Sequence, residues 1–124
     1  MEEVKLLRLR KRDSNKTGRW AENKAARLLK NNGYTIIEKN FHCRDGEIDI
    51  IAHKGDLLVF VEVKSRFDGS EPLEYITPSK RAKIIKCARF FMQKRNISDM
   101  DVRFDAIGIS ENKIEWIKNA FMEE

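Results

Sequence analysis

The spacing of apolar residues along the chain predicts two helices and five strands. Apolar residues recur at helical spacing between Thr17 and Gly33, and again between Pro78 and Arg95. Shorter runs rich in β-branched and aromatic residues are typical of strands. These runs lie at residues 34–41, 47–53, 57–66, 102–109 and 114–118. Because short turns separate the first three strands, the pattern predicts an antiparallel meander within the order α-β-β-β-α-β-β.

The ends of both helices carry recognisable signals. A threonine oxygen can accept hydrogen bonds from the free amides of a first turn, so we expect Thr17 and Thr77 to cap the two helices. Pro78 then fits the first helical position, where its missing amide costs little. Gly33 is expected to end the first helix, because glycine readily adopts the left-handed conformation found there.

The strand at residues 57–66 differs from the others because two charged residues interrupt an apolar run. Side chains alternate along a strand, so Glu62 and Lys64 point to the same side as Phe60. Burying an ionised group is costly unless it is paired or binds a metal. An internal salt bridge at a strand end is one interpretation. A functional site is favoured over it, since buried pairs stabilise weakly and functional sites perturb charges.

The composition indicates one folded domain with a polyanion as a plausible partner. The chain has 124 residues, 41% of them hydrophobic, and a net charge of +5. Its first 30 residues carry ten basic and four acidic side chains, and residues 78–98 carry seven basic and none acidic. Residues 1–16 lack a sustained period and are interpreted as a flexible basic arm, which leaves residues 17–124 as the domain.

Other patterns exclude several classes of protein. No run of about 18 apolar residues is present, so neither a membrane span nor a membrane partner is expected. The N-terminus lacks the apolar segment of a secretory signal, and a cytoplasmic location in a bacterium or archaeon is the default expectation. Cys43 and Cys87 give neither a disulfide framework nor the paired spacing of a zinc site. Cys87 is expected as a small core residue of the second helix.

Acidic residues from three predicted elements can converge near Lys64. Antiparallel pairing of the second and third strands would place Asp49 beside Glu62, while Glu22 borders the packed face of the first helix. Hard cations such as Mg²⁺ bind oxygen ligands, and a lysine beside the metal can orient the attacking water or neutralise developing charge. The sequence therefore predicts one acidic metal site at the sheet's edge, suited to phosphodiester hydrolysis.

Further residues have both a structural and a functional interpretation. Trp20 and Trp116 are expected mainly in the core, with stacking against nucleic-acid bases as the alternative. Glu47 shares Asp49's side of its strand and is either an outer group of the site or a hairpin surface residue. Asp105 is expected to anchor the structure rather than bind a metal.

The same residues resemble a known nuclease superfamily. Asp49 followed by Glu62-Val63-Lys64, after a helical Glu22, resembles the PD-(D/E)xK nucleases. The segments that resemble the small YraN family of uncharacterised prokaryotic proteins are residues 18–22, 40–41, 46–49, 60–66, 77–80 and 103–105. The order of elements and the helical glutamate are also similar to those of archaeal Holliday-junction resolvases. One departure is that an isoleucine, not the superfamily's proline, precedes Asp49.

The resemblance implies a restriction-endonuclease-like α/β fold, with an αβββαβ core and a mixed sheet flanked by two helices. It implies that Asp49, Glu62 and the Val63 carbonyl hold Mg²⁺ or Mn²⁺, and that Glu22 reaches the metal directly or through water. Lys64 would assist the attacking water. The basic residues expected to contact nucleic acid are Arg19, Arg66, Lys80 and Lys83; for Lys80, a solvated helix position is an equal alternative.

The expected function is that of a divalent-metal-dependent endonuclease acting on DNA, with branched or structured DNA favoured by the resemblance. A nucleic-acid-binding or adaptor domain with little turnover is the main alternative, because a fold does not prove an activity. A subunit whose exposed faces serve protein partners is a second alternative. Cleavage of a two-fold symmetric junction would suit a homodimer.

Overall fold

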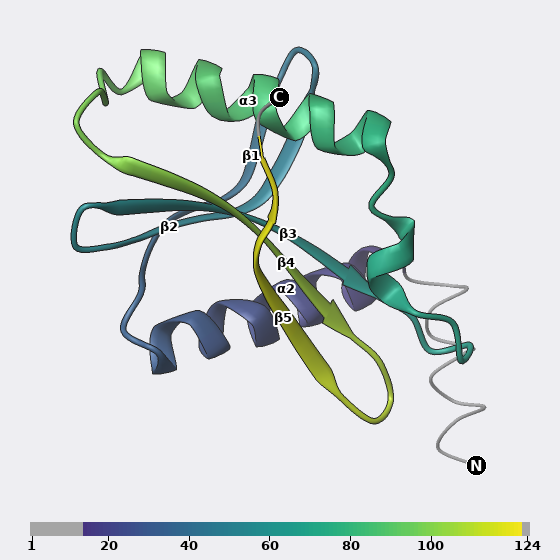
Figure 1. Cartoon of the computed structure of the whole chain (residues 1–124). Coiled ribbons are helices and arrows are strands. Elements are labelled where there is room, and N and C mark those ends of the chain that lie inside the picture. The colour runs from purple at the N-terminus through teal and green to yellow at the C-terminus, as the bar shows by residue number, and fades with distance from the viewer. Residues whose placement is uncertain (1–13, 123–124) are drawn as a thin grey trace.

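A computed structural model of the chain describes residues 14–122, in which a five-stranded sheet lies between two helices (Figure 1). The elements are α2 (Ser14–Asn31), β1 (Thr35–Cys43), β2 (Gly46–Lys54), β3 (Leu57–Ser65), the 3-10 turn η1 (Pro72–Tyr75), α3 (Pro78–Lys94), β4 (Asp101–Ile109) and β5 (Ile114–Phe121). The larger part of the predicted arm, residues 1–13, lies outside the described residues. Neither described helix combines the length and apolar character needed to cross a membrane.

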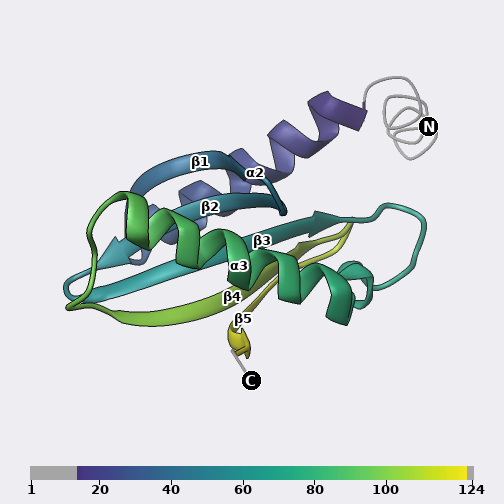
Figure 2. The same cartoon turned by 90° about the horizontal axis from the view of Figure 1, so that it is seen from above.

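The sheet is mixed, and its strand order follows the chain from β1 to β5. Strands β1, β2 and β3 pair antiparallel, β3 and β4 pair parallel, and β5 returns antiparallel to β4. A parallel pair needs a crossover connection, which η1 and α3 supply (Figure 2). The predicted α/β fold, with a mixed sheet flanked by two helices, is therefore confirmed.

Of the four residues predicted at the helix ends, Thr77, Pro78 and Gly33 are confirmed and Thr17 is not. Thr77 caps α3 and accepts a hydrogen bond from the Lys80 amide at 3.2 Å. Gly33, with a φ of 90°, ends α2 as expected. Thr17, however, lies inside α2, which begins at Ser14 and so takes in residues 14–16 of the predicted arm. Several residues before Thr17 (Asp13, Ser14 and Asn15) are also of types that favour a helix start, so residue type alone could not fix the first turn.

Strand β3 separates two apolar cores by simple alternation. Val59, Val61 and Val63 pack in the cluster beneath α2, whereas Leu58 and Phe60 pack in the cluster beneath α3. Because the strand is central, both of its faces are covered, which explains its long apolar run. The alternation is the one that the sequence predicted.

The hairpin of β1 and β2 does not keep a single alternation. Asn40 has a left-handed φ of 54°, and the end of the hairpin coils behind α3 (Figure 1). Phe41 and Ile48 therefore pack with Ile51 in the cluster beneath α3, while Ile50 faces α2. The alternation of the strand predicted at residues 47–53 would place Ile48, Ile50 and Ala52 on one side; for Ile48 that prediction is wrong, since strict alternation assumes a strand without such a coil.

The coil also brings two distant cysteines together. Cys43 at the end of β1 and Cys87 in α3 form a disulfide, with their Cα atoms 5.7 Å apart. The expectation that the two cysteines form no disulfide framework is therefore wrong. They are 44 positions apart in the chain, and their approach depends on where the hairpin end lies against α3. Cys87 is fully buried, as expected.

Candidate active site

The candidate site lies where β2 and β3 part. Their backbone pairing ends at Ile50 and Val61, and the next residues, Asp49 and Glu62, are held close together. An Asp49 carboxylate oxygen accepts a hydrogen bond of 2.8 Å from the Val63 amide. A side chain thus takes the place of the missing strand partner. Since β2 and β3 are inner strands, the expectation of a site at the sheet's edge is wrong.

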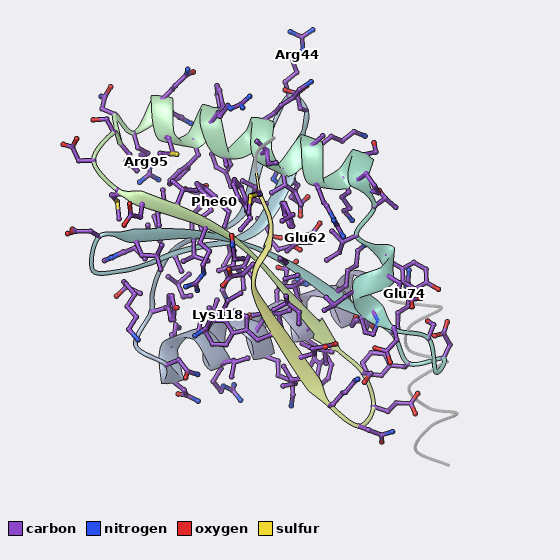
Figure 3. The ribbon with its side chains drawn as sticks, in the orientation of Figure 1. Arg44, Phe60, Glu62, Glu74, Arg95 and Lys118 are labelled. Atoms are coloured by element: carbon purple, nitrogen blue, oxygen red, sulfur yellow. A yellow bond between two sulfur atoms is a disulfide. The ribbon has the colours of Figure 1, made fainter. Side chains whose placement is uncertain are left out.

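Glu62 is buried without full compensation for its charge. Its side chain lies on the α3 side of the sheet, with Phe60 (Figure 3), and only 3% of the residue is exposed. The buried Oε2 atom has no hydrogen-bond partner among residues 14–122, and the Lys80 ammonium lies 3.6 Å away. A buried oxygen left in this way carries a desolvation cost. Binding of a cation would remove that cost.

Burial and the closeness of the carboxylates to one another raise the pKa values of two of them. Burial, together with the hydrogen bond and the charge of Glu62, raises the pKa of Asp49 to about 8. Burial and the neighbouring Asp49 also raise the pKa of Glu22. Carboxylates this close cannot all ionise at low cost. A divalent cation would supply the compensating charge, and oxygen donors are the ligands that Mg²⁺ prefers.

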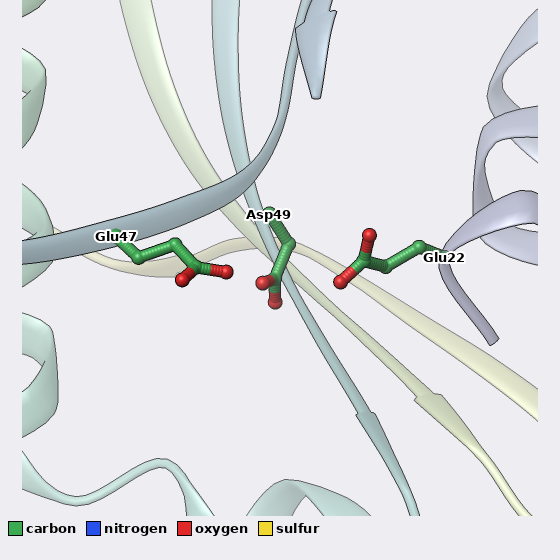
Figure 4. Close-up of side chains that lie close together, drawn as sticks. All are labelled: Glu22, Glu47 and Asp49. Atoms are coloured by element: carbon green, nitrogen blue, oxygen red, sulfur yellow. The ribbon is translucent and has the colours of Figure 1, made fainter. Parts of the chain in front are cut away.

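Three carboxylates from two elements form a cluster that a metal ion could bridge. Glu22 approaches from α2, and Glu47 and Asp49 approach from β2 (Figure 4). One oxygen of each lies within 4.8 Å of the others. Glu47 was not a predicted ligand, although its spacing of two residues from Asp49 was the available signal. It also contacts His42, at 2.9 Å between Oε2 and Nε2.

Two lysines face the acidic groups. Lys64 lies two residues beyond Glu62 on β3, and burial together with the neighbouring Lys80 lowers the pKa of Lys64. Burial opposes the charge on Lys80, but its contacts with Lys64 and with Glu62 and Asp49 outweigh this and raise the pKa of Lys80. The two ammonium groups thus share one environment. Of the two interpretations of Lys80, a place at the site fits its contact with Glu62.

Two hollows meet at these residues. A cleft of about 320 Å³ between the hairpin and α3 contains the acidic residues of β2 and β3 and is lined by Lys80 and Lys83. A second hollow, of about 190 Å³, lies between the start of α2 and the end of β3. It is lined by Glu22 and Arg66, and both hollows share Val63 and Lys64. Arg19, the remaining predicted contact to nucleic acid, is exposed on α2 and outside the walls described for either hollow.

The structure therefore brings the predicted acidic and lysine residues together. The residues that meet are Glu22, Asp49, Glu62, Val63, Lys64, Lys80 and Lys83. Chemically, they offer carboxylate oxygens for a hard cation and ammonium groups for an anion beside it. Their roles stay predictions.

Comparison with known proteins gives the relatives of the chain. The sequence pattern of the uncharacterised protein family UPF0102 matches residues 21–109. A UPF0102 protein of Desulforapulum autotrophicum is 44% identical over 113 residues, covering 86% of this chain and 93% of the relative. A UPF0102 protein of Legionella pneumophila is 48% identical, covering 84% and 92%. One of Persephonella marina is 49% identical, covering 84% and 91%.

Proposed function

We propose that this chain, which belongs to the uncharacterised protein family UPF0102, is a divalent-metal-dependent nuclease of the PD-(D/E)xK type. The observation that carries the proposal is the buried carboxylate of Glu62 beside Asp49, at a cleft that is also lined by three lysines. The site lies where two strands part, so an extended chain could reach it from solvent. The resemblance to PD-(D/E)xK nucleases and archaeal resolvases agrees with the α-β-β-β-α-β order of the fold.

The proposed metal ligands are the carboxylates of Asp49 and Glu62 and the carbonyl of Val63, with Glu22 and Glu47 beside them. They suit Mg²⁺ or Mn²⁺, because all are oxygen donors and several are negatively charged. When bound, the ion would polarise a phosphoryl oxygen and lower the pKa of a bound water. The negative charges of these acidic residues would balance the positive charge of the ion. Their mutual repulsion, which contributes to the raised pKa values of Asp49 and Glu22, would then decrease.

The lysines are assigned to the phosphate and the water. Lys64 extends from the same strand as Glu62 and orients the attacking water or stabilises the developing charge. Lys80 and Lys83 extend from the first turns of α3 into the cleft and bind phosphate oxygens. A lysine is a point charge that tolerates several phosphate positions, which suits binding without sequence preference.

DNA is the proposed substrate, with branched or structured DNA favoured by the resemblance. The net charge of +5 and the lysines of the cleft favour a polyanion, and binding should weaken as salt increases. We propose a cytoplasmic location, where such a substrate is found, and a homodimer for a substrate with two-fold symmetry.

Cleavage assays test the proposal directly. Branched and linear DNA of one sequence are incubated with the purified chain and Mg²⁺ or Mn²⁺. We expect cleavage that falls at least about 100-fold in Asp49→Asn and in Lys64→Ala, because each removes a group that acts at the reacting phosphate. Lys94→Ala is the matched control, since this exposed lysine lies in the last turn of α3, about 21 Å along the helix from Lys80.

Other outcomes separate the alternatives. Salt-dependent DNA binding without cleavage on every substrate would favour the nucleic-acid-binding or adaptor domain. No DNA binding at all would favour a subunit that serves protein partners. Cleavage that persists equally in Asp49→Asn and Lys64→Ala would point to a contaminating nuclease. Calorimetric titration with Mn²⁺ adds a readout that is independent of turnover, and Asp49→Asn should weaken that binding.

A further inference from the structure

A large aromatic side chain stands exposed beside the candidate site. Trp20 is 45% exposed, so the expectation that it lies in the core is wrong. It lies on α2 two residues before Glu22, and its ring packs against Phe67 with centroids 5.8 Å apart. Phe67 is itself buried, so it supports the ring from one side. Other large apolar residues, such as Phe90, are equally exposed, so what distinguishes Trp20 is its place beside the candidate site and not its exposure alone.

The surroundings of Trp20 are cationic. The Lys24 ammonium lies 5.2 Å from the centroid of the Trp20 ring. Arg66, the residue before Phe67, stacks its guanidinium 3.8 Å over the ring of Tyr75, which is 40% exposed. The buried Nε atom of Arg66 has no hydrogen-bond partner among residues 14–122. A guanidinium with an unused donor suits a phosphate, which it can bind through two parallel hydrogen bonds.

The second hollow connects this region to the candidate metal site. Its walls include Gly18, Ala21 and Glu22 from α2, Lys64 from β3, and Arg66 directly after that strand. Neither Trp20 nor Phe67 lines the hollow, but each is the chain neighbour of a residue that does, Ala21 and Arg66, so the contacting aromatic pair lies close to it. A chain that enters the cleft at Lys80 and passes Lys64 would leave through this hollow toward Trp20.

We infer that the hollow between α2 and the end of β3 receives an unpaired nucleotide next to the cleaved phosphate, with Arg66 binding its phosphate and Trp20 stacking on its base. This inference rests on the proposed function. It assigns a substrate class: a nucleic acid with a single-stranded segment on one side of the cleavage position. A base inside a duplex has both faces covered by its neighbours, so only an unpaired base offers a face to the Trp20 ring.

A nucleic acid explains these features better than an apolar protein surface does. Lys24 lies over the exposed ring, and Arg66, the residue before the Phe67 that supports the ring, has an unused hydrogen-bond donor. Stacking on an aromatic ring combined with a cationic path for the backbone is the usual arrangement for single-stranded nucleic acid. Glu22 is the acidic exception in the wall, and it lies on the side of the proposed metal ion.

The test measures binding in EDTA, so that it does not depend on cleavage. A short single-stranded DNA and a blunt duplex of the same sequence are titrated into the full chain at one salt concentration. We expect Trp20→Ala to weaken binding of the single strand about 10- to 100-fold and to change binding of the duplex less than about threefold. Trp20→Phe should retain part of the preference, because a phenylalanine ring can still stack.

Fluorescence gives a second readout that does not depend on measuring an affinity. The sequence has two tryptophans, and the indole of Trp116 is held by a 2.9 Å hydrogen bond to Asp105. The single strand should quench the fluorescence of the wild-type chain, and Trp20→Phe should abolish that quenching. The ratio of single-strand to duplex affinity is used, so that partial unfolding of a variant affects both terms alike.

The outcomes distinguish this inference from the proposed function. An unchanged ratio in Trp20→Ala, or equal quenching in wild type and Trp20→Phe, would overturn the inference even if the wild type cleaves DNA. A ratio that falls as expected, in a chain that cleaves no substrate tested, would retain the single-strand site and overturn the nuclease proposal instead.

Discussion

Two buried carboxylates on neighbouring strands have opposite surroundings. Glu62 on β3 pairs in register with Ala106 on β4, one residue from Asp105. Asp105 is fully buried and accepts hydrogen bonds of 2.8 to 2.9 Å from the side chains of Arg103 and Trp116 and from the Asn119 amide. Glu62 has an oxygen without such a bond and a lysine at 3.6 Å.

The difference shows how to separate structural from functional charge in this fold. The donors around Asp105 satisfy its carboxylate oxygens, and those of Trp116 and Asn119 also fix β5 to β4, so the group needs nothing further. Around Glu62, by contrast, burial and the neighbouring Glu62 raise the pKa of Asp49, so the two carboxylates are costly to ionise together without a further cation. A buried charge of the second kind indicates a missing cationic partner. The expectation that Asp105 anchors the structure agrees with its bonds.

The largest expected effect is on the structural carboxylate. Asp105→Ala would leave the Arg103 guanidinium, which is bound at 2.8 Å on two nitrogens, without its carboxylate partner. We expect the free energy of unfolding to fall by about 3–5 kcal/mol, measured by urea denaturation. A loss below about 1 kcal/mol would remove the distinction between the two carboxylates.

The corresponding change at the site should affect activity and spare stability. Glu62→Gln keeps the shape of the side chain and removes its uncompensated charge. We expect DNA cleavage to fall about 10²- to 10³-fold, as for loss of a group that stabilises the transition state. Urea denaturation of the same variant in EDTA should give an unfolding free energy equal to or above that of the wild type. A clear loss of stability would assign Glu62 to the structural class.

The disulfide belongs to the region of the candidate site and not to the region of Asp105. It joins the coiled hairpin to α3, the two elements that form the walls of the cleft, and it lies away from the Asp105 network. Cys43→Ser should lower the unfolding free energy by about 2–4 kcal/mol under oxidising conditions. In excess reductant, wild type and variant should become similar in stability. A difference that persists in reductant would show that cysteine packing, and not the bond, is responsible.

The smallest expected effect is on pH dependence without metal. The pKa of Asp49 is raised from 3.8 to about 8 by folding, so its contribution to stability is full below about pH 4 and is lost as pH rises through 8. In EDTA at pH 9, Asp49→Asn should therefore be more stable than wild type by on the order of 1–2 kcal/mol. Glu111→Gln, at an exposed turn carboxylate, is the matched control and should show no such gain.

Local signals predicted the elements, because those signals act over a few residues. Thr77 and Pro78 specify the start of α3 through one turn of backbone, and the alternation of Val59 to Val63 needs only the pleat of a strand. The same kind of signal predicted that residues 22, 49, 62 and 64 lie close together, because the pattern of apolar residues predicts both the antiparallel pairing of the strands and the packed face of the helix. Strand β5 extends three residues beyond its prediction, to Phe121, whose ring stacks on Phe104 at 5.3 Å.

The sequence by itself thus determined the order of the elements, the two faces of β3 and the acidic residues that could share a cation. Only the tertiary structure decided the side of Ile48, the partner of Cys43, the approach of Lys80 to Glu62 and the exposure of Trp20. Each of these depends on how far the hairpin coils behind α3, or on where α3 and the start of α2 lie against β3. Such placements result from packing between distant segments, for which no short stretch of sequence carries the information.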